Sequence, residues 1–70
     1  MVEKTIDLTG ISANSIEDAV GLAVSRAGVT IDGIRQARVI DVIANVENGQ
    51  VTQWKVRCKL TFLVQDRVHE

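Results

Sequence analysis

The dipeptide Asn48-Gly49 lies between two long runs rich in β-branched residues, and it constrains the fold more than any other feature of the chain. Asn-Gly is typical of a two-residue type I′ turn joining antiparallel strands, because both residues tolerate positive φ. Ile34 to Val46 and Val51 to Val64 are therefore predicted to form a long hairpin. The turn predicts these cross-strand pairs: Val46 with Val51, Ile43 with Trp54, Val39 with Cys58, and Ala37 with Leu60.

Both faces of this hairpin carry apolar side chains. The last strand alternates, and its more apolar side is expected to pack on a helix; that side holds Trp54, Val56, Cys58, Leu60, Phe62 and Val64, with Ile43, Val39 and Ala37. The opposite side mixes basic and aliphatic groups, namely Lys55, Arg57, Lys59 and Thr61 with Ile34, Gln36, Arg38, Ile40, Val42 and Ala44. One short helix can cover only one of these faces.

A strand and a helix are predicted before the hairpin. Val2 to Thr9 alternates with a period of two, and Gly10 is expected to end this strand. Ser15, followed three positions later by Asp18, resembles a capping box. The helix that follows should end near Gly28, and its apolar stripe comprises Ile16, Ala19, Val20, Ala23, Val24 and Ala27.

These elements predict an α+β subunit of order β-α-β-β, spanning residues 1–70 as a single domain. The first and second strands run parallel, so the third must lie between them, and the sheet order is expected to be 1-3-2. This order leaves the long, aliphatic second strand at an exposed edge, which is an aggregation hazard unless another copy covers it. The sequence therefore predicts homo-oligomerisation.

The size of the chain supports the same expectation. A folded chain of 70 residues buries only about 60% of the surface that it exposes when unfolded. Cys58 is the only cysteine and His69 the only histidine, so neither an intrachain disulfide nor a cluster of zinc ligands is available. Self-association is the remaining way to stabilise a small core.

Charge and hydropathy argue against several functional classes. The formal net charge is −1, so no strong basic field favours nucleic acid. No stretch approaches the length of a membrane span or the pattern of a secretory signal, and we expect a cytoplasmic protein. We also predict that it is not an enzyme, because His69 lies near the C-terminus and Cys58 is expected to be buried and inert.

At this point the chain resembles a known family, the dodecins. The similarity rests on a collinear set of segments: Ile6-Asp7-Leu8-Thr9-Gly10-Ile11-Ser12, Glu17-Asp18-Ala19, Ser25-Arg26-Ala27, Arg38-Val39-Ile40, Gly49-Gln50-Val51-Thr52-Gln53-Trp54-Lys55-Val56 and Lys59-Leu60-Thr61-Phe62. The resemblance implies a sheet partly wrapped around one helix and a hollow homododecamer. It also implies that flavins such as FMN or riboflavin bind between subunits, stacked on a tryptophan and edge-bonded by a glutamine.

The chain departs from the family pattern at both of those positions. Gln36 matches the stacking tryptophan, and Lys55 matches the edge-bonding glutamine. Glutamine offers no comparable π-face, and lysine is a donor only, so flavin binding should be weakened. The chain is similar to dodecin-like proteins that lack the tryptophan, some of which bind calcium. The candidate ligand-binding residues are Gln36, Lys55, Arg38 and Arg57. The calcium or magnesium ligands are not identified, and a shared ion on a symmetry axis, with one carboxylate from each subunit, is left open.

Two interpretations of the basic residues remain. They could form a modified pocket for an anionic small molecule, or they could pair with Glu3, Asp7, Glu17, Asp18 or Asp41 of neighbouring subunits. The function expected from the sequence is binding and storage of a small ligand by a non-catalytic shell. The alternative is a flavin-independent shell that binds divalent cations or serves as a scaffold.

Overall fold

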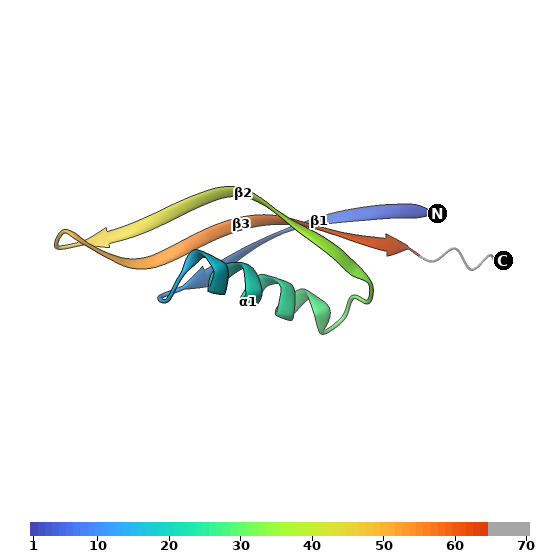
Figure 1. The fold of residues 1–70 in the computed structure, drawn as a ribbon, viewed down its shortest axis with the longest axis horizontal. Coiled ribbons are helices and arrows are strands. Elements are labelled where there is room, and N and C mark those ends of the chain that lie inside the picture. Colours follow the sequence, from blue (N-terminus) through green and yellow to red (C-terminus); the bar gives the residue numbers. More distant parts are fainter. Residues whose placement is uncertain (65–70) are drawn as a thin grey trace.

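Residues 1–64 are described by the computed structural model, and they form one β-α-β-β unit (Figure 1). Strand β1 spans Val2–Ser12, helix α1 spans Ile16–Gly28, strand β2 spans Ile34–Glu47 and strand β3 spans Gln50–Val64. The sheet has three strands in the order β1-β3-β2, with antiparallel pairing on both sides of β3. The predicted fold class and strand order are confirmed. Figure 1 shows α1 under one face of the sheet, while the β2-β3 hairpin extends beyond the helix.

The hairpin turn has the geometry that its sequence predicts. Asn48 has φ 53° and Gly49 has φ 75°, so two successive residues occupy the left-handed region. Two positive φ values are the signature of a type I′ turn, whose twist matches that of the flanking strands. Glu47 pairs with Gln50 next to the turn, and Val46 pairs with Val51 beyond it, as predicted.

Side-chain hydrogen bonds fix the start of α1. Ser15 is the N-cap, and its Oγ accepts a hydrogen bond from the backbone N–H of Asp18 at 2.9 Å. The Asp18 carboxylate accepts a hydrogen bond from the buried Ser12 hydroxyl at 2.6 Å. The predicted cap is therefore confirmed. The Asp18 carboxylate also links the first turn of the helix to Ser12 at the end of β1.

Gly10 has a different role from the predicted one. β1 continues through it to Ser12, so the expectation that Gly10 ends the strand is wrong. A Cβ added at Gly10 would overlap the backbone carbonyl of Ala19. Glycine is required here because α1 lies directly against β1, and the buried Ala19, Ala23 and Ala27 allow this close packing.

The hairpin register departs from the prediction between two irregularities. Val39 pairs with Cys58 and Ala37 with Leu60, as predicted. Ile43, however, pairs with Lys55, and Ala44 takes the place opposite Trp54. The pairing shifts between Val39 and Asp41 and again between Asn45 and Val46, with a further shift between Ile34 and Gln36. A bulge inserts an unpaired residue, and a one-residue slip moves side chains to the other face of the sheet.

These shifts correct the predicted faces of β2. Directly paired residues share a face, so Ile43 lies on the side away from α1 and not on the helix side. Three residues predicted to lie away from the helix instead share its side: Ile34, Val42 and Ala44, which pair with Phe62, Val56 and Trp54. Ile34 also packs against the core cluster, which agrees with this placement.

The core of the single subunit is small. Its largest fully buried side chains are Leu60, Val56 and Cys58. The radius of gyration is 14.9 Å, compared with about 11 Å for a compact domain of this length. The subunit is therefore an elongated slab that measures 58 × 19 × 13 Å.

Much of the hairpin remains apolar and uncovered in the single chain. The exposed large apolar residues of the hairpin from Val39 to Val51 are named here the apolar arm: Val39, Ile40, Val42, Ile43, Val46 and Val51. The part of the arm near the turn lies beyond Ser12, where β1 ends opposite Trp54. Neither α1 nor β1 shields that end of the hairpin (Figure 1).

Candidate functional site

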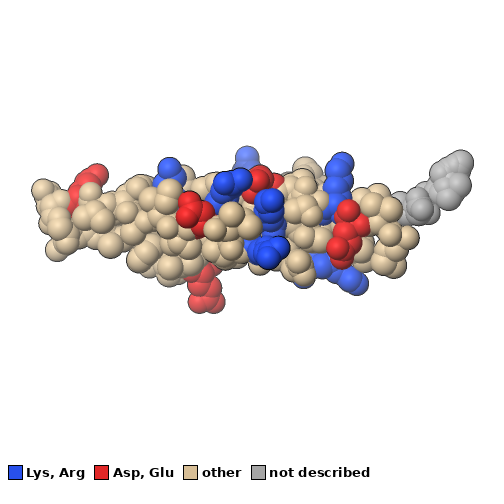
Figure 2. Space-filling view, turned by 90° about the horizontal axis from the view of Figure 1, so that it is seen from above, with Lys and Arg blue, Asp and Glu red and all other residues tan. Residues whose placement is uncertain are grey.

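The face of the sheet away from α1, named here the outer face, carries most of the candidate site residues. Its central row comes from β3 and consists of Lys55, Arg57, Lys59 and Thr61, flanked by β1 on one side and β2 on the other. Figure 2 shows that charged side chains gather over the middle of the molecule and toward the termini, while the hairpin end carries few. The outer face thus has a charged centre and an apolar end.

All four residues predicted to bind a ligand lie on this face. Gln36 pairs with Thr61 and Arg38 with Lys59, while Arg57 and Lys55 belong to the central row. The structure does not bring the four together. Thr61 and Lys55 are six positions apart along β3, which corresponds to about 20 Å. Gln36 and Lys55 of one subunit therefore cannot hold the same small molecule between them.

Arg57 forms an ion pair within its own chain. Its Nη2 lies 3.1 Å from Oδ2 of Asp7 on β1. The hydrogen bond that Arg57 donates to Asp7, and then the charge of Asp7, raise the pKa of Arg57, and the charge of Asp41 adds to this effect. Both partners remain about half exposed, so solvent screens the pair. The prediction that cations pair with acids of neighbouring subunits does not hold for this arginine, whose partner is intramolecular.

Arg38 and Lys59 form a pair of like charges. They are directly opposed across β2 and β3, and both are exposed. Asp7 is the β1 neighbour of Lys59, but its carboxylate is bonded to Arg57. Among residues 1–64, the single ion pair is the one between Arg57 and Asp7. Arg38 and Lys59 therefore have no carboxylate partner in the described part of the chain.

Lys55 lies in an apolar environment. Its two cross-strand neighbours are Ile11 on β1 and Ile43 on β2, and these are 48% and 47% exposed. The aliphatic stem of a lysine can lie along such side chains while the ammonium reaches water. Lys55 is accordingly half-buried, although it lies on an exposed face.

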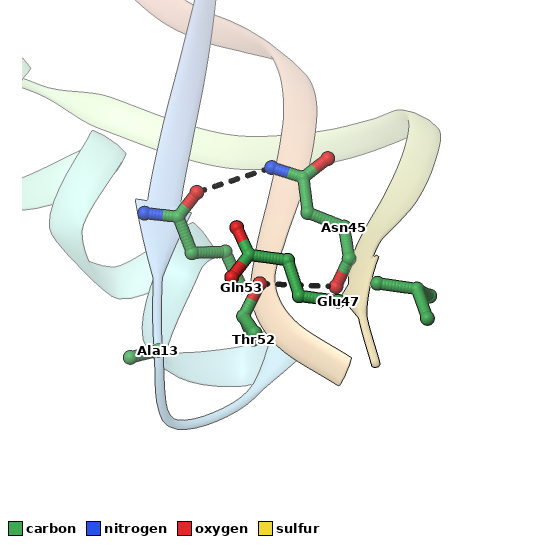
Figure 3. Close-up of a pocket in the computed structure, with 6 residues that line it drawn as sticks. Ala13, Asn45, Glu47, Thr52 and Gln53 are labelled. Carbon is green, nitrogen blue, oxygen red and sulfur yellow. Dashed lines mark hydrogen bonds between the residues drawn. The ribbon is translucent and has the colours of Figure 1, made fainter. Parts of the chain in front are cut away.

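A shallow hollow lies near the hairpin turn (Figure 3). Ala13, Asn45, Val46, Glu47, Thr52 and Gln53 line it. The Asn45 side-chain amide donates a hydrogen bond to Gln53 Oε1 at 3.1 Å, and the Thr52 hydroxyl donates one to the Asn45 carbonyl at 3.3 Å. Sequence reasoning did not identify this hollow, whose lining residues Asn45 and Val46 flank a register shift that has no clear sequence pattern. Three of its polar residues, Asn45, Thr52 and Gln53, therefore already bond to one another.

The described residues of one subunit do not assemble a metal site. Among residues 1–64, no three His, Cys, Asp or Glu side chains gather closely enough to hold an ion. Asp7 is bonded to Arg57, and Asp18 accepts a bond from Ser12. Calcium takes six to eight oxygen ligands, so a single chain does not fit a calcium ion. The predicted shared site, with one carboxylate from each subunit, stays a prediction.

The remaining candidate residues have structural positions. Trp54 is partly buried on the helix side, as predicted, and is not a platform on the outer face. Cys58 is fully buried, and burial raises the pKa of its thiol. His69 lies outside the described residues. Within residues 1–64 the structure has no helix with the length and apolar character that a membrane span requires.

Together, the fold and the outer face define a class of protein: a small α+β subunit whose single helix covers only part of its sheet. Comparison with known families then identifies the family. The Dodecin family model matches residues 2–65, and the chain belongs to the dodecin family. Proteins of this family are small binding and storage proteins that form multimeric shells.

Individual relatives agree with this assignment. The chain is 36% identical to calcium dodecin of Mycobacterium tuberculosis over 61 residues, which cover 87% of this chain and 86% of that protein. The solved structure of the same protein, which contains a calcium-binding site, matches with a TM-score of 0.80 and covers 100% of both chains. A dodecin from Streptomyces coelicolor matches with a TM-score of 0.86 and 31% identity over 93% of both chains.

Proposed function

We propose that this chain is a non-catalytic subunit, with residues 1–70 as a single domain, that assembles into a hollow dodecin-type homododecamer and stores a small ligand. The observation that carries the proposal is the uncovered apolar arm. Six valine and isoleucine side chains of the hairpin stay exposed in one subunit, and exposed apolar edges of this length favour pairing with another copy. Membership of the dodecin family supports the same architecture.

The ligand that we favour is a divalent cation rather than a flavin. The relative that is 36% identical is a calcium dodecin. In this chain Gln36 replaces the aromatic platform expected for a flavin, and Lys55 replaces the glutamine expected to bond its edge. Because one subunit does not supply enough carboxylates, we infer that calcium or magnesium would be held by side chains of several subunits.

Native mass spectrometry tests the assembly. We expect a species of twelve subunits at micromolar concentration, and a soluble monomer under those conditions would overturn the proposal. Calorimetry with calcium tests the ligand. Saturable heat is expected for the assembled protein, whereas no heat at millimolar calcium would exclude the cation.

The flavin alternative has a simple optical test. Added riboflavin should keep its fluorescence in the presence of this protein, because neither Gln36 nor Lys55 reproduces the stacking and edge contacts of a flavin site. Strong quenching would restore flavin as the ligand. If neither calcium nor riboflavin binds, the scaffold alternative gains support. A cytoplasmic location stays a prediction from the sequence.

A further inference from the structure

We infer that Arg38 and Lys59 form an anion-binding site for the phosphate group of a small molecule. The two side chains are directly opposed on the outer face. Directly opposed residues have Cβ atoms about 4.5–5.5 Å apart, so a guanidinium and an ammonium can reach the same oxyanion. This inference does not depend on the calcium proposal, because it concerns a different ligand and different side chains.

The first argument is the uncompensated charge. Like charges placed directly opposite on a sheet are destabilising. The carboxylate that could neutralise Lys59 belongs to Asp7, and Asp7 is bonded to Arg57 at 3.1 Å. Asp41, the carboxylate of β2 on this face, is the cross-strand partner of Arg57, and its charge also raises the pKa of Arg57. Both nearby carboxylates therefore act on Arg57, and the adjacent Arg38 and Lys59 remain without an ion pair among residues 1–64. A bound anion removes this repulsion.

The second argument is the polar row beside the pair. Gln36 and Thr61 are cross-strand partners, and they lie next to Arg38 and Lys59 on the same face. Thr5 pairs with Thr61 from the other side. Thr61 is only 8% exposed, but Gln36 and Thr5 on either side of it are exposed. Their amide and hydroxyl groups can donate hydrogen bonds to an oxyanion or to the hydroxyl groups of a sugar attached to it. No carboxylate lies in this row to repel an anion.

The third argument concerns the kind of anion. Arginine presents a planar fork that matches two phosphate oxygens, and lysine supplies a compact point charge. Two cations are suited to a phosphate that carries close to two negative charges. The formal net charge of the chain is −1, so this local site does not favour a long polyanion such as nucleic acid.

Calorimetry on the intact oligomer tests the inference. The probes are inorganic phosphate and ribose 5-phosphate, with ribose as the uncharged control, and a chelator removes divalent cations so that the calcium proposal is not tested at the same time. Binding of either phosphate probe, without binding of ribose, supports the site. No heat with either probe at millimolar concentration would overturn it.

Variants assign the binding to these two residues. Combining Arg38→Gln with Lys59→Gln should weaken phosphate binding at least tenfold, whereas Arg26→Gln, at an exposed cation in the last turn of α1, should leave it unchanged. Equal weakening by both would show non-specific attraction and overturn the site. Arg38→Lys keeps the charge but loses the fork, so it should retain weaker binding even if the double variant fails to assemble; unchanged affinity would contradict the role of Arg38.

A stability measurement separates this site from contacts between subunits. If Arg38 and Lys59 only repel each other in the unliganded protein, the double variant should melt at a higher temperature than the parent without phosphate. Phosphate should raise the melting temperature of the parent and not that of the variant, because a ligand stabilises the state that binds it. A double variant that melts lower, together with no effect of phosphate on the parent, would show that carboxylates of a neighbouring subunit neutralise the pair.

Discussion

Gly10 lies where the backbones of β1 and α1 approach too closely for any side chain. Gly10→Ala would place a methyl group on the carbonyl of Ala19, which is backbone and cannot rotate away. We expect the substitution to push α1 off the sheet and to reduce the free energy of unfolding by about 1–3 kcal/mol, the range typical of overpacking. Chemical denaturation at fixed protein concentration measures the change.

A second glycine supplies the matched control. Gly21 lies within α1, and a Cβ added there meets no atom within 4 Å. Gly21→Ala should therefore stabilise the subunit by up to about 1 kcal/mol through helix propensity. If both alanine variants had the same stability, the close approach at Gly10 would not be the reason for its glycine.

Cys58 predicts a dependence of stability on pH. Burial raises the pKa of its thiol, so the folded protein keeps the neutral form to a higher pH than the unfolded chain does. This contribution is fully present below the unfolded pKa of about 8.5, and it is lost as the pH rises through the folded value. Denaturation from pH 8 to 10 should show a fall in stability that is smaller in Cys58→Ala.

The reactivity of Cys58 provides an independent check of its burial. A disulfide reagent such as Ellman's reagent attacks the thiolate, which is both inaccessible and suppressed in the fold. The native protein should react far more slowly than the protein in denaturant. Equal rates in the two conditions would show that the thiol is not buried in solution.

At the scale of the elements, the predictions succeeded where local chemistry decides the structure. Asn48-Gly49 determines the turn, and Ser15 with Asp18 determines the start of α1, because these residues act on backbone groups within a few positions. The prediction failed for Ile43, whose face depends on an irregularity several residues away. Val39 and Ile40 are two adjacent large apolar residues at the irregularity, and they interrupt the alternation of apolar and polar positions. This interruption was the sequence feature that could have indicated the change of face.

The helix cap provides a test at the same scale. Ser15→Ala removes the acceptor of the Asp18 backbone N–H, and we expect a loss of about 1 kcal/mol of stability. Ser25→Ala, at an exposed position of the same helix, should change stability little. Thermal unfolding of both variants at one protein concentration makes the comparison, and equal melting temperatures would contradict the capping role of Ser15.

For the whole molecule, the sequence predicted the need for partners but not the layout of the site. Composition and length already indicated that one helix could not cover both faces of the hairpin. The sequence could not show that Gln36 and Lys55 lie far apart along the outer face, because that distance depends on the strand register. Nor could it show that Arg57 is bonded within its own chain, because that bond depends on side-chain geometry. These facts direct attention to Arg38 and Lys59, which are directly opposed on that face and have no ion-pair partner among residues 1–64.

The corrected register also determines the best test of assembly. A register without bulges would select Val42 as an outer-face contact, but Val42 pairs with Val56 on the helix side, so its substitution would not test the outer face. Ile43 lies on the outer face and is 47% exposed in the single chain. Ile43→Glu places a charge in a surface that another copy must cover, and burying an unpaired charge costs several kcal/mol.

We therefore expect Ile43→Glu to shift the native mass spectrum from the assembled species toward monomers and to increase aggregation, since the apolar arm loses its cover. Ile43→Val keeps the surface apolar and should preserve the assembly, and Ser25→Glu tests whether an added charge elsewhere is tolerated. An intact oligomer in the Ile43→Glu variant would mean that this part of the outer face is not buried between subunits. The apolar arm would then have to be covered by contacts that leave Ile43 in water.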